Sequence, residues 1–477
     1  MTPLGRISRR QLLQRGAHGF GMLALAHLAG LDARRASADS SNRAPWMVHP
    51  VKVKHVVLLF MDGGPSQVDT FDPKPILTRE HGKPFPASVD ATQFDQNGKC
   101  LGSPFRFSPR GKSGLMISDL FPHLSTLADD LCVIRSMKAD FAEHSQACFH
   151  LHCGHPLQGK PSVGSWICYG LGAEHENLPG YVVLNGGLLP IGGGENFSNA
   201  FLPAVHQGTI FDTYTGSELV SNVTPAEAVA DQRRLLDFVA LEDKSFHQSL
   251  GGQASPEAMA VEAAIRNYET ACAMQVSVPN LVQFADETAA TQSSYGLDSA
   301  NPHTKQFARE CLLTRRLIER GVRFIELTMM KGIRFVAPWD DHGDISEGHP
   351  KMAAAVDQPI AALIKDLKAR GLFDSTLLIF AGEFGRTPFA QGGKGRDHNP
   401  QGFSIWLAGG GIRGGQAYGA TDEFGYRAVE NVVTVHDLHA TILYLMGMDH
   451  ELLTYRWGGR DLRLTDVYGN VLHDCLI

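Results

Sequence analysis

Acidic and histidine side chains that could bind a metal ion occur in three separated segments of the sequence. Asp62 and Glu383 each follow an apolar run, and His398 lies in the motif GRDHNP. A third segment, the acidic motif WDDHGD, supplies three more candidate ligands: Asp340, Asp341 and His342. Carboxylates and imidazoles are ligands that proteins offer to divalent metals. We therefore expect the three segments to be parts of one metal site.

The apolar runs before Asp62 and Glu383 indicate buried strands. The run VVLLF at 56–60 is apolar throughout, which is typical of a strand covered on both faces in a parallel sheet. Open α/β sheets bind ligands beyond the carboxyl ends of their strands. Gly63, Gly64 and Gly382 would let the backbone approach such a ligand closely. Both carboxylates are therefore expected to emerge at the same edge of one sheet.

Apolar runs alternate with helical or irregular stretches along most of the chain. Strands are expected at 54–60, 131–136, 181–184, 323–329, 376–381 and 403–408. This alternation predicts the α/β class, with a three-layer α/β/α sandwich. A crossover helix is predicted from Pro350 to Arg370, with Gly371 as its stop. Residues 225–320, rich in Ala, Glu, Arg and Leu, predict a helical insertion on one face or edge.

The N-terminus has the features of a twin-arginine (Tat) export signal. SRRQLLQRG is followed by a short apolar stretch, and Ala36-Ser37-Ala38 fits a cleavage site. We expect residues 1–38 to be the signal and 39–477 a periplasmic or otherwise extracytoplasmic protein without a transmembrane segment. Removing the signal changes the formal charge from −7 to −12, because it holds six basic and one acidic residue. That charge argues against nucleic acid as a partner.

The eight cysteines show no CxxC spacing, so neither a zinc ribbon nor a thioredoxin motif is indicated. Disulfides are compatible with an oxidising compartment but not required in a chain with this large a core. Several cysteines are expected to be small buried hydrophobes.

An ordered set of motifs, from about residue 45 to the C-terminus, resembles a Tat-exported bacterial family named domain of unknown function fifteen-oh-one. The motifs are MDGGPSQVDTFDPKP, PSVGSWICYGLG, WDDHGD, GEFGRTP, GRDHNP, LAGGGIRGG and VHDLHATILYLMGMD. That family is similar to the sulfatase and alkaline phosphatase superfamily. The resemblance implies a single alkaline phosphatase-like domain over 39–477, with a mostly parallel sheet and the helical insertion at about 225–320.

The resemblance also implies a role for each candidate ligand. Asp62 matches the first-strand metal ligand, Glu383 stands where the superfamily has a later aspartate, and His398 matches the last histidine. The middle loop contributes Asp340 and His342. One or two divalent ions are expected, with zinc favoured and manganese, calcium or magnesium as alternatives.

Two departures from the superfamily pattern leave parts of this site open. Where alkaline phosphatases have an acid followed by histidine, this chain has Glu383-Phe384. Asp341, Asp344 and Asp397 are substitutes among which spacing does not choose. The C-x-[PA]-x-R motif of formylglycine sulfatases is absent from the sequence, so that type of sulfatase is disfavoured.

The segment HSQACFHLHCG at 144–154 resembles the phosphatase segment that carries the nucleophile, which puts Ser145 at that position. A serine at a helix start beside a metal is suited to attack, although it could instead only cap the helix. Ser66 is a lesser candidate. His144, Cys148 and His152 recur every four residues and would share one helix face. That face could bind metal, or it could place one histidine near the site and pack the rest.

Arg386 could contact an anionic substrate through its planar guanidinium, or it could form a structural ion pair. Lys394 and Arg396, in the expected loop before His398, could contact the anion more loosely.

These features predict an exported, metal-dependent hydrolase of phosphate or sulfate esters, not of the formylglycine type, acting on a small anionic ester. The alternative is a non-catalytic, sulfatase-like binding protein in a periplasmic or cell-surface assembly. The resemblance makes an exported cytochrome-like protein a candidate partner for that role.

Overall fold

The computed structural model describes residues 44–90, 92, 97–174, 177–214, 219–220, isolated positions between 231 and 246, 256–332 and 337–477. The predicted signal at 1–38 lies outside these residues. Their main feature is a nine-stranded sheet in the order β13-β5-β12-β9-β1-β8-β6-β7, with β16 also paired to β5. Its strands are β1 (His55–Phe60), β5 (Leu131–Lys138), β6 (Tyr181–Asn185), β7 (Thr209–Asp212), β8 (Phe324–Leu327), β9 (Thr376–Ala381), β12 (Phe403–Gly409), β13 (Gln416–Tyr418) and β16 (Val433–Thr434).

The sheet is parallel except at β12, which is antiparallel to both of its neighbours, β5 and β9. β1 lies at its centre, parallel to β8 on one side and β9 on the other. All six expected strands form, and the predicted mostly parallel α/β sheet is confirmed. Because β1 and β9 run side by side in the same direction, the residues that follow them emerge at one edge.

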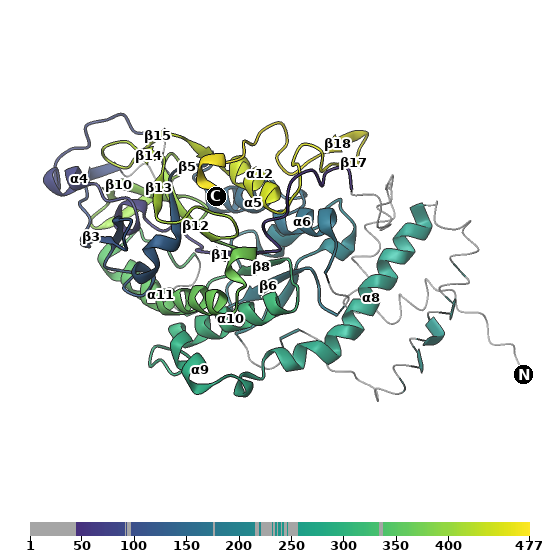
Figure 1. Ribbon diagram of the computed structural model, residues 1–477. Coiled ribbons are helices and arrows are strands. Elements are labelled where there is room, and N and C mark those ends of the chain that lie inside the picture. The colour runs from purple at the N-terminus through teal and green to yellow at the C-terminus, as the bar shows by residue number, and fades with distance from the viewer. Residues whose placement is uncertain are drawn as a thin grey trace, which may run out of the picture.

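Helices cover both faces of the sheet, as Figure 1 shows. Val57 and Leu59 of β1 point to one face, into a core shared with α10 (Pro302–Glu319) and α11 (Ile345–Ala369). Val56 and Leu58 point to the other, into a core shared with α5 (His144–Cys153), α6 (Val163–Leu171) and α12 (Val435–Leu445). Every residue of β1 is buried, which explains why its sequence is apolar without alternation.

The crossover helix α11 begins at Ile345 rather than at the predicted Pro350. The side chain of Asp344 accepts a hydrogen bond from the backbone N–H of Ser346 and so caps the helix. Pro350 lies inside its first turns, where the sequence alone favours a helix start. The helix ends before Gly371, whose φ of +69° continues the chain in the left-handed region.

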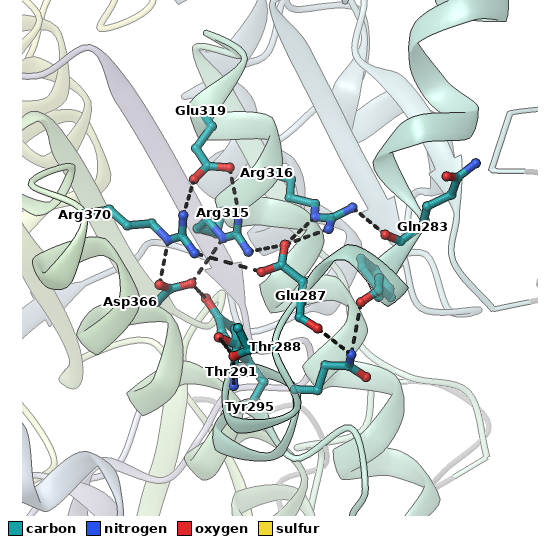
Figure 2. Close-up of polar contacts among 12 residues, drawn as sticks. Gln283, Glu287, Thr288, Thr291, Tyr295, Arg315, Arg316, Glu319, Asp366 and Arg370 are labelled. Carbon is teal, nitrogen blue, oxygen red and sulfur yellow. Dashed lines mark hydrogen bonds and ion pairs between the residues drawn. The ribbon is translucent and has the colours of Figure 1, made fainter.

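The described part of the expected insertion contains α8 (Pro256–Leu281), α9 (Ala289–Tyr295) and α10. Figure 2 shows a network of ion pairs that joins α10 and the loop before α9 to α11. Arg315 contacts Glu287, Glu319 and Asp366, and Arg316 also contacts Glu287. None of the described helices combines the length and hydrophobicity needed to cross a lipid bilayer.

A smaller three-stranded sheet lies beside the main one and is formed by β2 (Asn97–Cys100), β10 (Gly385–Gln391) and β11 (Gly395–Asn399). β10 and β11 form a hairpin that carries Arg386, Arg396 and His398. Of the loop predicted before His398, Gly392 and Gly393 form the hairpin turn, whereas Arg396 lies in strand β11. The remaining described strands and short α-helices are α3 (Gln67–Thr70), α4 (Pro75–Arg79), β3 (Phe107–Arg110), β4 (Leu115–Ser118), β14 (Ala420–Thr421), β15 (Ala428–Glu430), β17 (Tyr455–Trp457) and β18 (Arg460–Leu462).

Candidate metal centre

Asp62 follows β1 and is 1% exposed. Neither of its carboxylate oxygens has a hydrogen-bond partner among the described residues. Burial, together with the nearby carboxylate of Glu383, raises the pKa of Asp62 well above its usual range. A buried ionised carboxylate is costly unless a cation or hydrogen-bond donors compensate its charge. The position therefore has the chemistry of a cation ligand.

Glu383 follows β9 and faces Asp62 from the neighbouring strand end. Its two oxygens accept hydrogen bonds from the backbone N–H of Gly63, at 3.0 and 3.1 Å. Gly63 has a φ of +106°, and a Cβ there would lie 2.4 Å from the backbone nitrogen of Asp340. Only glycine allows this close approach of the first acidic loop to the middle loop.

Asp340, in the middle loop, lies among three histidines and one arginine. Its Oδ1 is 2.7 Å from Nε2 of His342, 3.1 Å from Nε2 of His398 and 2.6 Å from Nη2 of Arg386. Burial alone would raise the pKa of Asp340, but the charge of Arg386 and hydrogen bonds from His144 and His342 hold it well below its usual range. Asp340 is therefore an ionised carboxylate available to a metal.

His398 turns one nitrogen toward this group. Its Nδ1 is 2.6 Å from the carbonyl oxygen of Ala142, which can only accept a hydrogen bond, so Nδ1 carries the proton. Nε2 then carries a lone pair and lies 3.1 Å from Oδ1 of Asp340 and 3.0 Å from Nε2 of His342. Burial and the nearby cations lower the pKa of His398 to about 4. A neutral imidazole oriented by a carbonyl is the usual form of a histidine ligand.

His144, the first residue of α5, lies between the two acidic groups. Its Nδ1 is 2.7 Å from Oε1 of Glu383, and its Nε2 is 3.6 Å from Oδ2 of Asp340. Burial alone would lower the pKa of His144, but the hydrogen bonds to Asp340 and Glu383 raise it to about 9. The sequence pattern placed His144 on one helix face with Cys148 and His152 but did not select it as a metal ligand. Its signal was the spacing of four residues to Cys148.

Three groups of side chains have ligand atoms within 4.8 Å of one another. An inner group consists of Asp62, Cys148 and Glu383, all buried; the outer groups are His144, Asp340 and His398, and His342, Asp397 and His398. The structure thus brings all five sequence-predicted ligands into these groups and adds His144, Cys148 and Asp397. Oxygen, nitrogen and sulfur donors together suit a transition-metal ion such as zinc. The residues present fit a metal centre, and the orphaned oxygens of Asp62 are the clearest sign of it.

The structure distinguishes the three acids that the sequence left open as replacements for the missing histidine ligand. Asp341 pairs with His349 at 3.2 Å, and Asp344 caps α11. Asp397 alone of the three belongs to a potential metal group.

Arg386 is 0% exposed, and each nitrogen of its guanidinium donates to the protein. Nε donates to the carbonyl of Gly64, Nη1 to that of Arg396, and Nη2 to Asp340 and the carbonyl of Gly63. Of the two roles that the sequence left open for Arg386, this geometry is that of the structural ion pair. Arg396 is likewise buried and pairs with Asp69 at 2.6 Å, whereas the exposed Lys394 lies 3.5 Å from Asp344.

Ser145 follows His144 in the first turn of α5 and is partly buried. Its hydroxyl donates to Oε2 of Glu143, which also accepts from the backbone N–H of Gln146. Glu143 is therefore the residue that caps α5. Ser145 does not have the capping role that the sequence offered as its alternative. Ser66 is fully buried, and its hydroxyl donates to Asp69.

Comparisons with solved structures find sulfatases and members of the alkaline phosphatase superfamily. The lipoteichoic acid synthase LtaP from Listeria monocytogenes matches at 10% identity, with 87% of this chain and 79% of that chain covered and a TM-score of 0.37. The PsFucS1 sulfatase from Pseudoalteromonas sp. matches at 13% identity, covering 83% and 68%, with a TM-score of 0.34. A protein in the alkaline phosphatase superfamily from Vibrio parahaemolyticus matches at 11% identity, covering 94% and 78%, with a TM-score of 0.34.

A search of curated proteins finds no match. The model of one protein family covers residues 53–476, nearly all of the described chain. The protein therefore belongs to the family described as Protein of unknown function (DUF1501).

Proposed function

We propose that the protein is an exported, metal-dependent hydrolase of phosphate or sulfate esters. The observation that carries the proposal is the buried carboxylate of Asp62, whose oxygens have no hydrogen-bond partner among the described residues. It lies beside a second acid, Glu383, with three imidazoles close by. Such a set of donors is costly to bury without a cation and suited to bind one.

Two metal positions follow from the grouping of donors. Asp62, Glu383 and Cys148 would hold an inner ion, and Asp340 and His398 an outer one, with His144, His342 or Asp397 completing it. The side chains of Asp340 and His342 are 23% and 25% exposed, so a substrate would approach from the outer side. When bound, the ions would polarise the ester and neutralise charge that develops in its hydrolysis.

The protein fixes these donors before substrate arrives. Arg386 holds Asp340 in its ionised form and orientation, and the carbonyl of Ala142 fixes the tautomer of His398. Gly63 aligns the carboxylate of Glu383. Preorganised donors of this kind require little rearrangement as charge develops on the substrate.

The proposed nucleophile is Ser145. Its hydroxyl is already hydrogen-bonded to the carboxylate of Glu143, which can accept its proton when the oxygen attacks. Burial alone would raise the pKa of Glu143, but hydrogen bonds, first from Ser145, lower it. Water is the other candidate, since the hydroxyl of Ser145 is directed toward Glu143.

The test is a screen of the mature protein with divalent metals against aryl phosphates and sulfates. Asp62→Ala and His398→Ala should abolish turnover. Asp374→Asn is the control and should retain turnover. It removes an exposed carboxylate just before β9, at the opposite end of that strand from Glu383. Full turnover in both ligand variants would refute the site, and no hydrolysis of any ester by the metal-loaded wild type would refute the activity.

The non-catalytic alternative is favoured by one observation. The guanidinium of Arg386 is buried and bonded throughout, so of its two open roles it takes the structural ion pair and not the anion contact. Under this alternative the protein would bind metal without hydrolysing esters and would serve in a periplasmic or cell-surface assembly. The candidate partner is an exported cytochrome-like protein. Co-purification of such a partner with an inactive, metal-loaded protein would favour this alternative.

A further inference from the structure

Cys148 lies on the face of α5 that points at the acidic pair. It is one turn after His144, so both side chains project from the same side of the helix. Its Sγ lies within 4.8 Å of carboxylate oxygens of Asp62 and Glu383. Cys148 is 0% exposed, so its thiol is shielded from solvent.

The helix that presents Cys148 is fixed against the sheet by a buried polar network. His152, one further turn along α5, places its Nδ1 2.7 Å from the carbonyl oxygen of Cys148 and its Nε2 2.7 Å from Oε1 of Glu326. The hydroxyl of Tyr181 donates to the other oxygen of Glu326 at 3.2 Å. Glu326 belongs to β8, so the network locks the rotation of α5 about its axis. The direction of the Cys148 side chain is therefore set by the fold.

A buried cysteine is often only a small core residue, and Cys148 does touch the core on this face of the sheet. A core position does not explain its acidic neighbours. Asp62 and Glu383 place two carboxylates next to the thiol, and both oxygens of Asp62 are without partners in the described chain. An apolar pocket would exclude such groups, whereas a metal position gathers them.

We propose that Cys148 is a thiolate ligand of the inner ion, together with Asp62 and Glu383. The inference rests on the metal centre of the proposed function and specifies its chemistry. On binding, the thiol releases its proton to solvent and the sulfur forms a bond to the metal, with no change of oxidation state. A sulfur donor selects zinc or cobalt over magnesium and calcium, which prefer oxygen. The two positions would then differ, with a soft inner ion and an outer ion held by oxygen and nitrogen.

Cobalt(II) titration of the metal-free protein tests the sulfur ligand directly, because thiolate ligation gives a sulfur-to-cobalt charge-transfer band in the near ultraviolet. The wild type should develop the band, and Cys148→Ser should lose it and bind zinc at least about tenfold more weakly. Cys168→Ser is the matched control, because Cys168 on α6 is a buried cysteine of the same core outside the inner group. That variant should keep both the band and the affinity. A band that survives Cys148→Ser, or a cobalt-loaded wild type without one, would overturn the proposal.

Zinc K-edge X-ray absorption of the wild type gives a test that needs no variant to fold. The proposal predicts a zinc–sulfur distance of about 2.3 Å, and a zinc shell of oxygen and nitrogen alone contradicts it. Ester hydrolysis is scored separately. Sulfur ligation without turnover would keep the ligand and reject the hydrolase, whereas turnover without sulfur ligation would keep the hydrolase and reject the ligand.

Discussion

The backbone N–H of Gly63 donates to both carboxylate oxygens of Glu383, at 3.0 and 3.1 Å. This contact joins the ends of β1 and β9, which run side by side in the sheet. It brings the carboxylate of Glu383 beside that of Asp62, and only His144 among the described side chains donates to either carboxylate. Two acids are thereby held together at the edge of the sheet, where a divalent cation would relieve their repulsion.

The unpaired charge at Asp62 gives a prediction with opposite signs in the two metal states. In the metal-free protein, Asp62→Asn removes a buried carboxyl group whose ionisation is opposed by burial and by the charge of Glu383, and should raise the thermal midpoint above that of the wild type. In the presence of zinc, the wild type should be the more stable, because the variant has lost a ligand. Thermal unfolding with chelator and with excess zinc measures both. A variant less stable than the wild type in both conditions would contradict the repulsion argument.

Arg386 is predicted to position Asp340 rather than to bind substrate. Arg386→Lys keeps the charge but loses the planar fork that holds Asp340 and the carbonyls of Gly63 and Gly64. The variant should be destabilised by about 2 kcal/mol, and its metal content should fall before any substrate is added. Denaturant unfolding and metal analysis check this, with the exposed Arg79→Lys as control. A normal metal content with only a raised KM would instead identify Arg386 as a substrate contact.

Ser145 is predicted to act in turnover without holding the metal. Ser145→Ala should lower kcat by at least about 100-fold, while metal content stays that of the wild type. Ser294→Ala, at an exposed helical serine of α9, is the control and should change neither quantity. Unchanged kcat in Ser145→Ala would leave water as the attacking group.

A buried histidine away from the metal groups predicts how stability depends on pH. Burial first, and then the neighbouring His436, lowers the pKa of His439 to about 3. His439 of the unfolded chain binds a proton near pH 6.5, whereas His439 of the folded chain does not. Its contribution to the free energy of unfolding is therefore fully present above pH 6.5 and is lost as the pH falls toward 3. At pH 5 the loss from His439 is on the order of 2 kcal/mol.

The comparison that isolates this histidine is His439→Gln against the wild type, in urea unfolding at pH 7 and pH 5 with chelator present. The glutamine side chain has no proton to gain in this range, so the variant should lose less stability between the two pH values than the wild type does. Equal losses would show that other groups carry the acid sensitivity.

The sequence was sufficient to predict the sheet edge and the acidic residues that follow its strands. The runs before Asp62 and Glu383 are apolar throughout because β1 and β9 are covered on both faces, and that pattern is local. The roles of His144 and Cys148 depend on which face of α5 meets the sheet. That choice is made by the contact between His152 and Glu326, which are far apart in the sequence.

The β10–β11 hairpin shows a second limit of sequence reasoning. The segment GRDHN has none of the apolar alternation of a strand, yet it is buried along its whole length as β11. Arg396 is accommodated there by its ion pair with Asp69. Tertiary contacts override local propensity at this position. They make Arg386 and Arg396 buried structural groups, which for Arg386 is one of the two roles that the sequence left open.

The divalent metal content of the folded mature protein, purified without chelator, tests the central claim most directly. It should be measured for the wild type, Asp340→Ala and His398→Ala. The account predicts one or two ions bound to the wild type and a lower content in both variants. A well-folded, metal-supplemented wild type with no bound metal would contradict it.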